Sequence, residues 1–169
     1  MEFYSVVYGR RSIRKYTNQP VPEESIQNIL RAAMAAPSAG NEQPWQFIVI
    51  QDRDALVRLP EVHPYASMVP EAQAAILVCG DRSLEKHEGY WVQDCAAATQ
   101  NLLLAVRAEG LGGVWLGVYP RQPRMKGLSE LLNLPDLIIP FSLIAIGYPA
   151  EEKGPSGRFK PDRIHKDRW

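Results

Sequence analysis

A long apolar segment in the second half of the chain limits the folds that this protein can adopt. Residues 92–112, VQDCAAATQNLLLAVRAEGLG, are rich in alanine and leucine, and Gly110 provides a helix end. A helix that is apolar on most of its faces has to be buried. We therefore expect a central helix within one compact domain, for which 169 residues are enough.

Four other apolar runs are typical of buried strands, because β-branched and aromatic residues dominate them or because glycine and proline bound them. They are PWQFIVIQD (44–52), AAILVCGD (74–81), GGVWLGVYP (112–120) and PFSLIAIGYP (140–149). Three shorter helices are expected at residues 3–9, 22–36 and 127–135. Four strands alternating irregularly with helices, without an internal repeat, favour a mixed fold of both element types.

The last twenty residues, AEEKGPSGRFKPDRIHKDRW (150–169), differ from the rest of the chain. They are polar, they contain proline and glycine, and they cannot build a core of their own. We expect this tail either to hang free or to dock on another surface. The sequence therefore divides into residues 1–149 and a C-terminal tail.

Composition excludes several classes of protein. Nineteen basic residues balance nineteen acidic ones, so the chain does not bind nucleic acid through bulk positive charge. No apolar run approaches the ~18 residues of a membrane span, and the N-terminus becomes charged too early for a signal peptide. Cys79 and Cys95 belong to no metal-ligand pattern and are interpreted as buried thiols. These features predict a cytoplasmic protein without a metal site.

The segment YGRRSIRKYT (8–17) concentrates positive charge in a chain of zero net charge. Arg10, Arg11, Arg14 and Lys15 surround Ser12 within six positions. Guanidinium groups and a hydroxyl are suited to a phosphate group. A solvated basic face without a ligand is the other interpretation that these residues leave open.

Two glycine-containing segments could contact a flat ligand or an anion through backbone groups. In APSAGNEQPWQF (36–47), small side chains expose the backbone, although these residues also suit a plain helix-to-strand loop. GLGGVWLG lacks the spacing of a dinucleotide-binding fingerprint. The three histidines, His63, His87 and His165, are scattered, and we expect them at the surface.

Together, RRSIR, PSAGNEQPWQF, GLGGVWLG and IAIGYP with its arginine-bearing tail resemble the FMN-dependent nitroreductase family, in order and over the whole chain. The resemblance implies an α+β fold. Its central sheet would be four-stranded and mostly antiparallel, flanked by helices and possibly extended by the tail of a partner subunit. Residues 1–149 would form the FMN-binding domain of an intertwined homodimer, and residues 150–169 would embrace the partner.

The resemblance also implies roles for individual residues. Arg10, Arg11, Ser12 and Arg158 would hold the FMN phosphate, with Lys160 and Arg163 as weaker candidates from the tail. Arg14 would stabilise negative charge at the pyrimidine edge of the ring. Trp115, Leu116 and Gly117 would lie against the ring, and a backbone N–H of Leu116 or Gly117 would face flavin N5. Four loop residues would contact the flavin of the partner subunit: Pro37, Ser38, Ala39 and Asn41.

The implied activity is that of an NAD(P)H oxidoreductase which reduces small electron-poor acceptors, such as nitroaromatics or quinones, by a ping-pong mechanism. No protein acid, base, nucleophile or metal is needed. A non-catalytic flavin carrier, a flavin-consuming oxygenase and a reductive dehalogenase of the same fold are the alternatives. Tyr65, Tyr90, Trp91 and Tyr119 could line an acceptor pocket or belong to the core.

This sequence departs from the family at one place. Many relatives have an asparagine or a lysine before the second strand, which binds the pyrimidine ring. The segment EVHPYASMVPEAQ offers only His63, Tyr65 and Ser67 as polar groups there, and Met68 is expected mainly as a packing residue.

Overall fold

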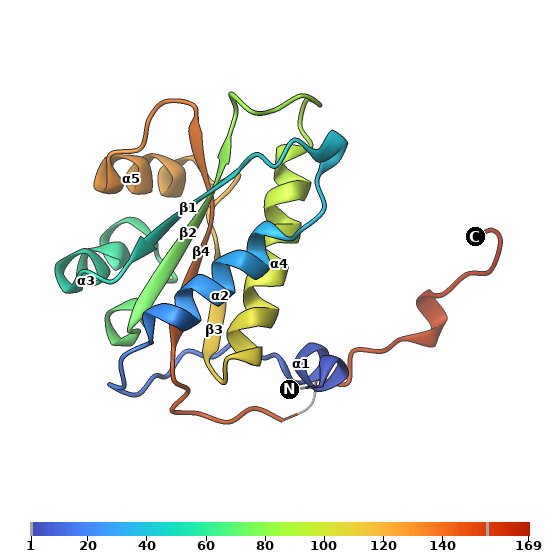
Figure 1. Ribbon diagram of the computed structural model, residues 1–169, viewed down its shortest axis with the longest axis horizontal. Coiled ribbons are helices and arrows are strands. Elements are labelled where there is room, and N and C mark those ends of the chain that lie inside the picture. The colour runs from blue at the N-terminus through green and yellow to red at the C-terminus, as the bar shows by residue number, and fades with distance from the viewer. Residues whose placement is uncertain (1, 155) are drawn as a thin grey trace.

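A four-stranded antiparallel sheet forms the centre of the structure, a computed structural model that describes residues 2–154 and 156–169 (Figure 1). Its strands are β1 (Trp45–Ile50), β2 (Ala74–Asp81), β3 (Gly112–Gly117) and β4 (Ile138–Gly147). Their order is β1-β2-β4-β3, and each neighbouring pair is antiparallel. The α+β fold and the four strands expected from the sequence are confirmed.

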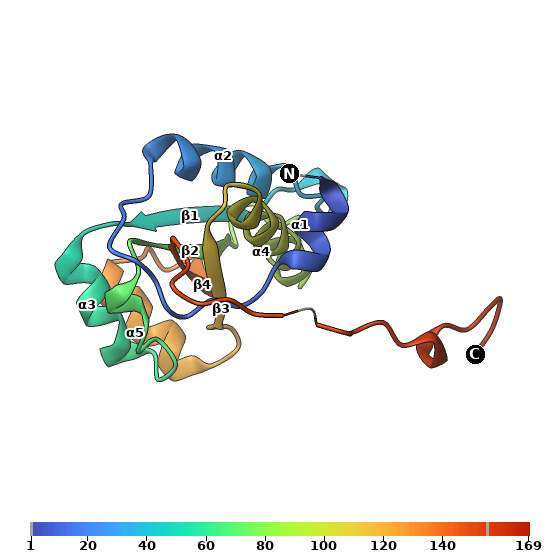
Figure 2. The same ribbon diagram turned by 90° about the horizontal axis from the view of Figure 1, so that it is seen from below.

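Helices cover both faces of this sheet (Figures 1 and 2). One face carries α2 (Glu23–Met34) and α4 (Trp91–Ala108), and the other carries α3 (Arg53–Val62) and α5 (Gln122–Leu132). The short helix α1 (Phe3–Gly9) lies beside the C-terminal end of α4. None of the helices in the described residues is both long and apolar enough to cross a membrane.

The layers enclose two hydrophobic clusters, one on each face of the sheet. Helix α4 contributes buried side chains along its length, including Cys95, Ala98 and Leu102, and packs against α2 and the sheet, as its apolar sequence predicts. Cys79 and Cys95 are free and fully buried, as expected. Burial raises the pKa of the Cys79 thiol to about 12 and also raises that of Cys95, so both remain protonated packing residues.

The sequence did not reveal α3, and it misplaced α5. Helix α3 begins where the Asp52 carboxylate accepts a hydrogen bond from the Ala55 N–H at 2.8 Å, and it contains Pro60, which argues against a helix. Helix α5 was expected at 127–135, but it begins at Gln122 and ends before Asn133, whose positive φ of 53° stops it. Gly127 lies in the middle of α5 because a Cβ there would approach Val62 Cβ to 2.8 Å.

The basic segment runs along the edge of the sheet formed by β3 and β4. The Ile13 N–H donates to the Gly113 carbonyl at 3.1 Å, and the Thr17 N–H donates to the Tyr148 carbonyl at 2.9 Å. A Cβ on Gly112 would lie 2.8 Å from Ile13 Cβ, so this close approach requires glycine. The segment is therefore built into the fold through its backbone.

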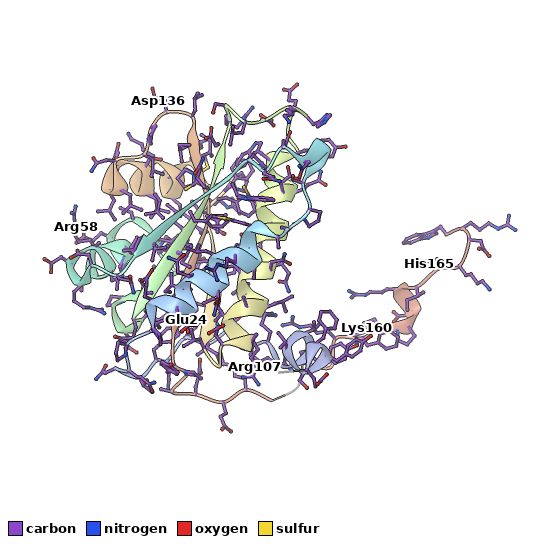
Figure 3. The ribbon with its side chains drawn as sticks, in the orientation of Figure 1. Glu24, Arg58, Arg107, Asp136, Lys160 and His165 are labelled. Atoms are coloured by element: carbon purple, nitrogen blue, oxygen red, sulfur yellow. The ribbon has the colours of Figure 1, made fainter. Side chains whose placement is uncertain are left out.

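After β4 the chain first follows the basic segment, to which residues 148–154 are hydrogen-bonded, and its last part extends into open space (Figure 2). Its three large apolar side chains, Phe159, Ile164 and Trp169, are 76%, 65% and 98% exposed. His165, labelled in Figure 3, likewise lies far from helices α1 to α5. Within one subunit, this tail has no surface on which to bury its apolar groups.

Candidate functional site

Two guanidinium groups from opposite ends of the chain lie close enough to influence each other. Arg10 follows α1, and Arg158 belongs to the tail. Partial burial lowers the pKa of Arg10, and the positive charges of Arg158 and Arg11 lower it further. In the described residues, no carboxylate lies within 4.0 Å of the Arg10 or Arg158 guanidinium. This pair of cations is therefore available to an anion.

The neighbouring residues are engaged with the backbone. Arg11 donates through Nη1 to the carbonyls of Tyr8 and Arg10 and through Nε to that of Gly154, each at 2.7 Å. Lys153 Nζ donates to the Ser12 carbonyl at 2.6 Å. Arg11 thus joins α1 to the start of the tail, and this contact occupies part of the guanidinium that was expected to hold phosphate.

The cavity at the edge of β3 joins Arg14 to the glycine-entered strand. It has a volume of about 330 Å³. Its lining residues are Arg14, Pro64, Tyr65, Ser67, Met68, Trp115, Leu116 and Gly117. The Arg14 backbone N–H donates to Glu151 Oε1 at 2.6 Å, and this bond, with Lys153 nearby, lowers the pKa of Glu151. The structure therefore brings together the predicted ring contacts and the expected charge-stabilising arginine.

His63 is buried, which contradicts its expected place at the surface. Its side chain is 1% exposed because it packs where α3 ends, beside the end of β3. His63 Nε2 lies 3.0 Å from the Gly117 carbonyl oxygen, and the Tyr65 N–H donates to Nδ1 at 3.3 Å. Nδ1 is an acceptor, so Nε2 carries the proton and donates to Gly117.

The charge state of His63 follows from its surroundings. Burial lowers the pKa of the imidazole, the hydrogen bond to Gly117 raises it, and the positive charge of Arg124 lowers it again. The net shift is downward. His63 therefore acts as a neutral hydrogen-bond donor that fixes the end of β3.

Arg124, on α5, is a second donor to the same carbonyl. Its Nη1 lies 2.6 Å from the Gly117 oxygen, and its guanidinium stacks over the Tyr65 ring with Cζ 5.1 Å from the centroid. Arg124 could not be recognised from the sequence, because α5 was expected to begin after it. His63 follows a pattern of buried leucines in α3, and recognition of that helix would have placed it at a helix end.

The loop at residues 37–41 lies apart from the cavity of Arg14, at the N-terminal end of α4 (Figure 1). Its 3₁₀ turn, Ala39–Asn41, contains positive φ angles of 52° at Gly40 and 54° at Asn41. The Ala39 N–H donates to Asp94 Oδ1 of α4 at 3.0 Å, whereas Pro37 and Asn41 are exposed. Within one subunit, residues 37–41 therefore do not line the cavity that contains Arg14 and residues 115–117.

The four aromatic residues considered for an acceptor pocket divide between pocket and core. Tyr65 lines the cavity and is 65% exposed. Trp91 is buried against Gly80, where a Cβ would approach the indole ring to 2.2 Å, so it belongs to the core. Tyr90 and Tyr119 are partly exposed and do not line the cavity. His87 and His165 are exposed, as expected.

Comparison with known proteins agrees with this architecture. The model of the nitroreductase family matches residues 7–63 and 60–148. A Methanothermobacter thermautotrophicus protein, provisionally named an NADH dehydrogenase/NAD(P)H nitroreductase, is 53% identical over 169 residues, which cover 100% of this chain and 88% of the relative.

Two solved structures extend this comparison. An FMN-dependent nitroreductase of Clostridium difficile R20291 is 28% identical, with a TM-score of 0.91 over 98% of this chain and 99% of that one. A nitroreductase-type structure from Desulfovibrio desulfuricans, solved in complex with FMN, is 32% identical, with a TM-score of 0.85 over 100% of this chain and 98% of that one.

The buried, neutral His63 predicts a specific loss of stability in acid. Below the ordinary histidine pKa of 6.5, the unfolded chain takes up a proton before the buried ring does. The free energy of unfolding should therefore fall as pH decreases from 6.5 through the lowered pKa, by at most about 1.4 kcal/mol per pH unit. His63→Gln keeps an N–H donor but has no such proton to gain.

Urea unfolding at about pH 8 and about pH 5 checks this prediction. His63→Gln should lose less stability between the two pH values than the unaltered chain. His165→Gln, in the exposed tail, is the control and should retain the full loss. Equal losses in all three proteins would show that His63 is not a buried neutral group.

Proposed function

The chain belongs to the nitroreductase family, and from this premise we propose that it is an FMN-dependent NAD(P)H oxidoreductase. It reduces small electron-poor acceptors, such as nitroaromatics or quinones, in a ping-pong cycle with NADH or NADPH as reductant. The observation that carries the proposal is the cavity in which Arg14 meets Trp115, Leu116 and Gly117. An arginine, an aromatic side chain and a strand-edge backbone provide charge, stacking surface and hydrogen-bond donors for a flavin ring.

The residues of this cavity suit the ring without the help of an acid or base. Bound FMN supplies hydride transfer through N5, so the chain has to orient the ring and stabilise charge on it. Arg14 places a positive charge in the cavity wall, and a backbone N–H of Leu116 or Gly117 would donate to N5 of the bound ring. His63 and Arg124 hold the Gly117 carbonyl and thereby keep this backbone in one orientation.

The FMN phosphate is assigned to the basic groups beside the start of the tail. The mutual influence of Arg10 and Arg158, neither of which has a carboxylate partner among residues 2–154 and 156–169, supports this assignment. Ser12 adds a hydroxyl on the same segment. Arg11 contributes mainly by joining α1 to the tail, and its remaining N–H groups would bind the phosphate.

The site is completed in a homodimer. Residues 37–41 lie outside the cavity of their own subunit, and we assign Pro37, Ser38, Ala39 and Asn41 to the flavin held mainly by the partner. Residues 1–149 form the FMN-binding domain, and residues 150–169 embrace the partner, where the exposed Phe159, Ile164 and Trp169 become buried. Use of NAD(P)H and the free thiols of Cys79 and Cys95 support a cytoplasmic location.

The visible spectrum of the purified protein tests the proposed function. We expect flavin absorption bands that disappear on anaerobic titration with NADH or NADPH and return when a nitroaromatic or a quinone is added. A protein that binds no FMN would overturn the proposal. Bands that neither nucleotide bleaches would indicate a flavin carrier, and loss of the flavin itself in air would indicate a flavin-consuming oxygenase.

Two arginine substitutions test the phosphate assignment. Arg10→Ala and Arg158→Ala should each raise the dissociation constant of FMN about tenfold to a hundredfold, because a hydrogen bond to a charged group contributes about 1.5–3 kcal/mol. Fluorescence quenching of FMN on titration measures this constant. Arg58→Ala is the control, since Arg58 projects from α3 away from this site (Figure 3). If Arg10→Ala or Arg158→Ala changes the dissociation constant of FMN no more than Arg58→Ala does, that arginine does not bind the phosphate.

Arg14 should differ from these residues in what its loss changes. Arg14→Ala should weaken FMN retention and also lower the midpoint potential of the bound flavin, because a fixed charge worth about 3 kcal/mol to the charged ring is removed. Spectroelectrochemical titration measures this potential. An unchanged potential would place Arg14 away from the ring.

Removal of residues 159–169 tests the dimer and keeps Arg158. The shortened chain should dissociate at concentrations at which the full chain is dimeric. If apolar burial worth about 3 kcal/mol is lost, its dimer dissociation constant should rise about a hundredfold. Sedimentation velocity over a concentration series measures the change. A shortened chain that stays as dimeric as the full one would show that the tail does not clasp the partner.

A further inference from the structure

Two buried carboxyl groups, Glu42 and Asp94, lie behind the loop at residues 39–41 and have no role in the site described above. Glu42 directly follows the 3₁₀ turn, and Asp94 belongs to the first turn of α4. Each residue is 5% exposed. Acidic side chains are rarely buried to this extent without compensating partners.

Backbone N–H groups satisfy one oxygen of each carboxyl group. Glu42 Oε2 accepts hydrogen bonds from the backbone of Lys86 at 2.6 Å and of His87 at 3.0 Å. Asp94 Oδ1 accepts one from the Ala39 N–H at 3.0 Å. The loop at residues 39–41 is thus connected to α4, and the segment before α4 is connected to Glu42.

The other two oxygens, Glu42 Oε1 and Asp94 Oδ2, are buried and have no donor among the described residues. Both groups are attached to Ala39, whose N–H donates to Asp94 Oδ1 and whose carbonyl accepts from the Glu42 N–H, each at 3.0 Å. Each group also shifts the pKa of the other, as two carboxyl groups in contact do. Two ionised carboxylates are both acceptors and would repel each other, so this contact requires a proton.

We propose that Glu42 and Asp94 share one proton, and that the resulting O–H···O hydrogen bond positions the flavin-contacting loop on the N-terminal end of α4. Both are positioning residues, which act on the flavin through Ala39 and its neighbours. The proposal rests on the proposed function, in which residues 37–41 contact FMN. One hydrogen atom would thereby hold together the loop, α4 and the segment at residues 86–87.

The electrostatics of the two groups agree with a single shared proton. Burial opposes ionisation of Glu42, but the bonds from Lys86, His87 and Asp94 prevail and lower its pKa. Burial raises the pKa of Asp94, the Ala39 N–H partly offsets this, and Glu42 raises it further. Asp94 is therefore the group that keeps the proton as pH rises.

His87 is the other titratable group that acts on both carboxyl groups. Lys86, on the same segment, contributes its backbone N–H. The His87 ring also covers the loop, since a Cβ on Gly40 would lie 2.4 Å from His87 Nε2. The loop is consequently packed between His87 and α4, and protonation of His87 would favour the ionised forms of both acids.

If the two groups share a proton, the position of the loop at residues 39–41 depends on pH. Between the lowered pKa of Glu42 and the raised pKa of Asp94, the pair carries one proton and the hydrogen bond forms. Above the pKa of Asp94, both groups are ionised and repel each other across a buried contact. FMN affinity should therefore fall as pH rises through the raised pKa of Asp94.

Amide substitutions provide a double-mutant cycle. Asp94→Asn supplies an N–H donor to Glu42, and Glu42→Gln supplies one to Asp94, so each single variant keeps the hydrogen bond and one negative charge. The double variant directs two NH₂ groups at each other, because the backbone N–H groups hold both amide oxygens. The same substitutions thus have opposite consequences alone and together.

The measurement is FMN binding by fluorescence quenching across a pH series, with urea unfolding of the flavin-free protein as a second readout. Each single variant should bind FMN within about twofold of the unaltered chain and lose the decrease in affinity at high pH. The double variant should bind at least about tenfold more weakly. Glu130→Gln, at an exposed position on α5, is the control and should keep the pH dependence.

Additive effects in the double variant would overturn the shared proton, as would single variants that keep the pH dependence. Failure of the proposed function has a different outcome, since then no variant binds FMN. In that case, urea unfolding of the flavin-free proteins still tests whether Glu42 and Asp94 share a proton. Both single variants should be close to the unaltered chain in stability, and the double variant should unfold at clearly lower urea.

Discussion

The structure depends on a backbone contact that holds four neighbouring cations against the edge of the sheet. Residues 12–17 are bonded to β3 and to the chain just after β4. The buried Tyr16 hydroxyl strengthens this contact by donating to the Ile13 carbonyl at 2.6 Å, with the Ala145 carbonyl at 3.3 Å. Because backbone groups and a neutral phenol provide the attachment, the guanidinium groups of Arg10 and Arg14 form no ion pair with any of residues 2–154 and 156–169. The fold thus tolerates the repulsion that Arg10 experiences from Arg11 and Arg158.

Sequence patterns predicted the sheet and its helical layers well, since apolar runs of strand length and the alanine-rich helix leave few alternatives. They failed where tertiary contacts override local preference. Pro60 argued against α3, yet its helix is stabilised by the Asp52 cap and by Leu56 and Leu59 in the core. Gly127 suggested the start of a helix, whereas its position in α5 is set by the close approach of Val62. The Asp52 cap is local, but the burial of Leu56 and Leu59 and the contact between Gly127 and Val62 depend on residues distant in sequence.

The candidate site was predictable to the extent that it uses local motifs. Arg14 and residues 115–117 belong to separate sequence motifs, and in the structure they line one cavity. His63 and Arg124 were missed, because their common target is a backbone carbonyl, which carries no sequence signature. Glu42 and Asp94 were missed for a different reason. Each looks like an ordinary polar residue until the fold buries it beside the other.

Although the net charge is zero, the acidic residues of this chain do not all form ion pairs with its arginines. Glu151 accepts from the Arg14 backbone N–H and pairs with Lys153, not with an arginine. Two other carboxylates are satisfied by uncharged N–H or O–H donors. Glu42 accepts from the backbone of residues 86–87, and Asp81 accepts from Ser83, whose hydroxyl and N–H together lower the pKa of Asp81. A carboxylate satisfied in this way stays ionised without neutralising a nearby arginine. Balanced composition is thus compatible with a locally positive site, and the location of ion pairs, not the total charge, decides whether a chain can hold a dianionic ligand.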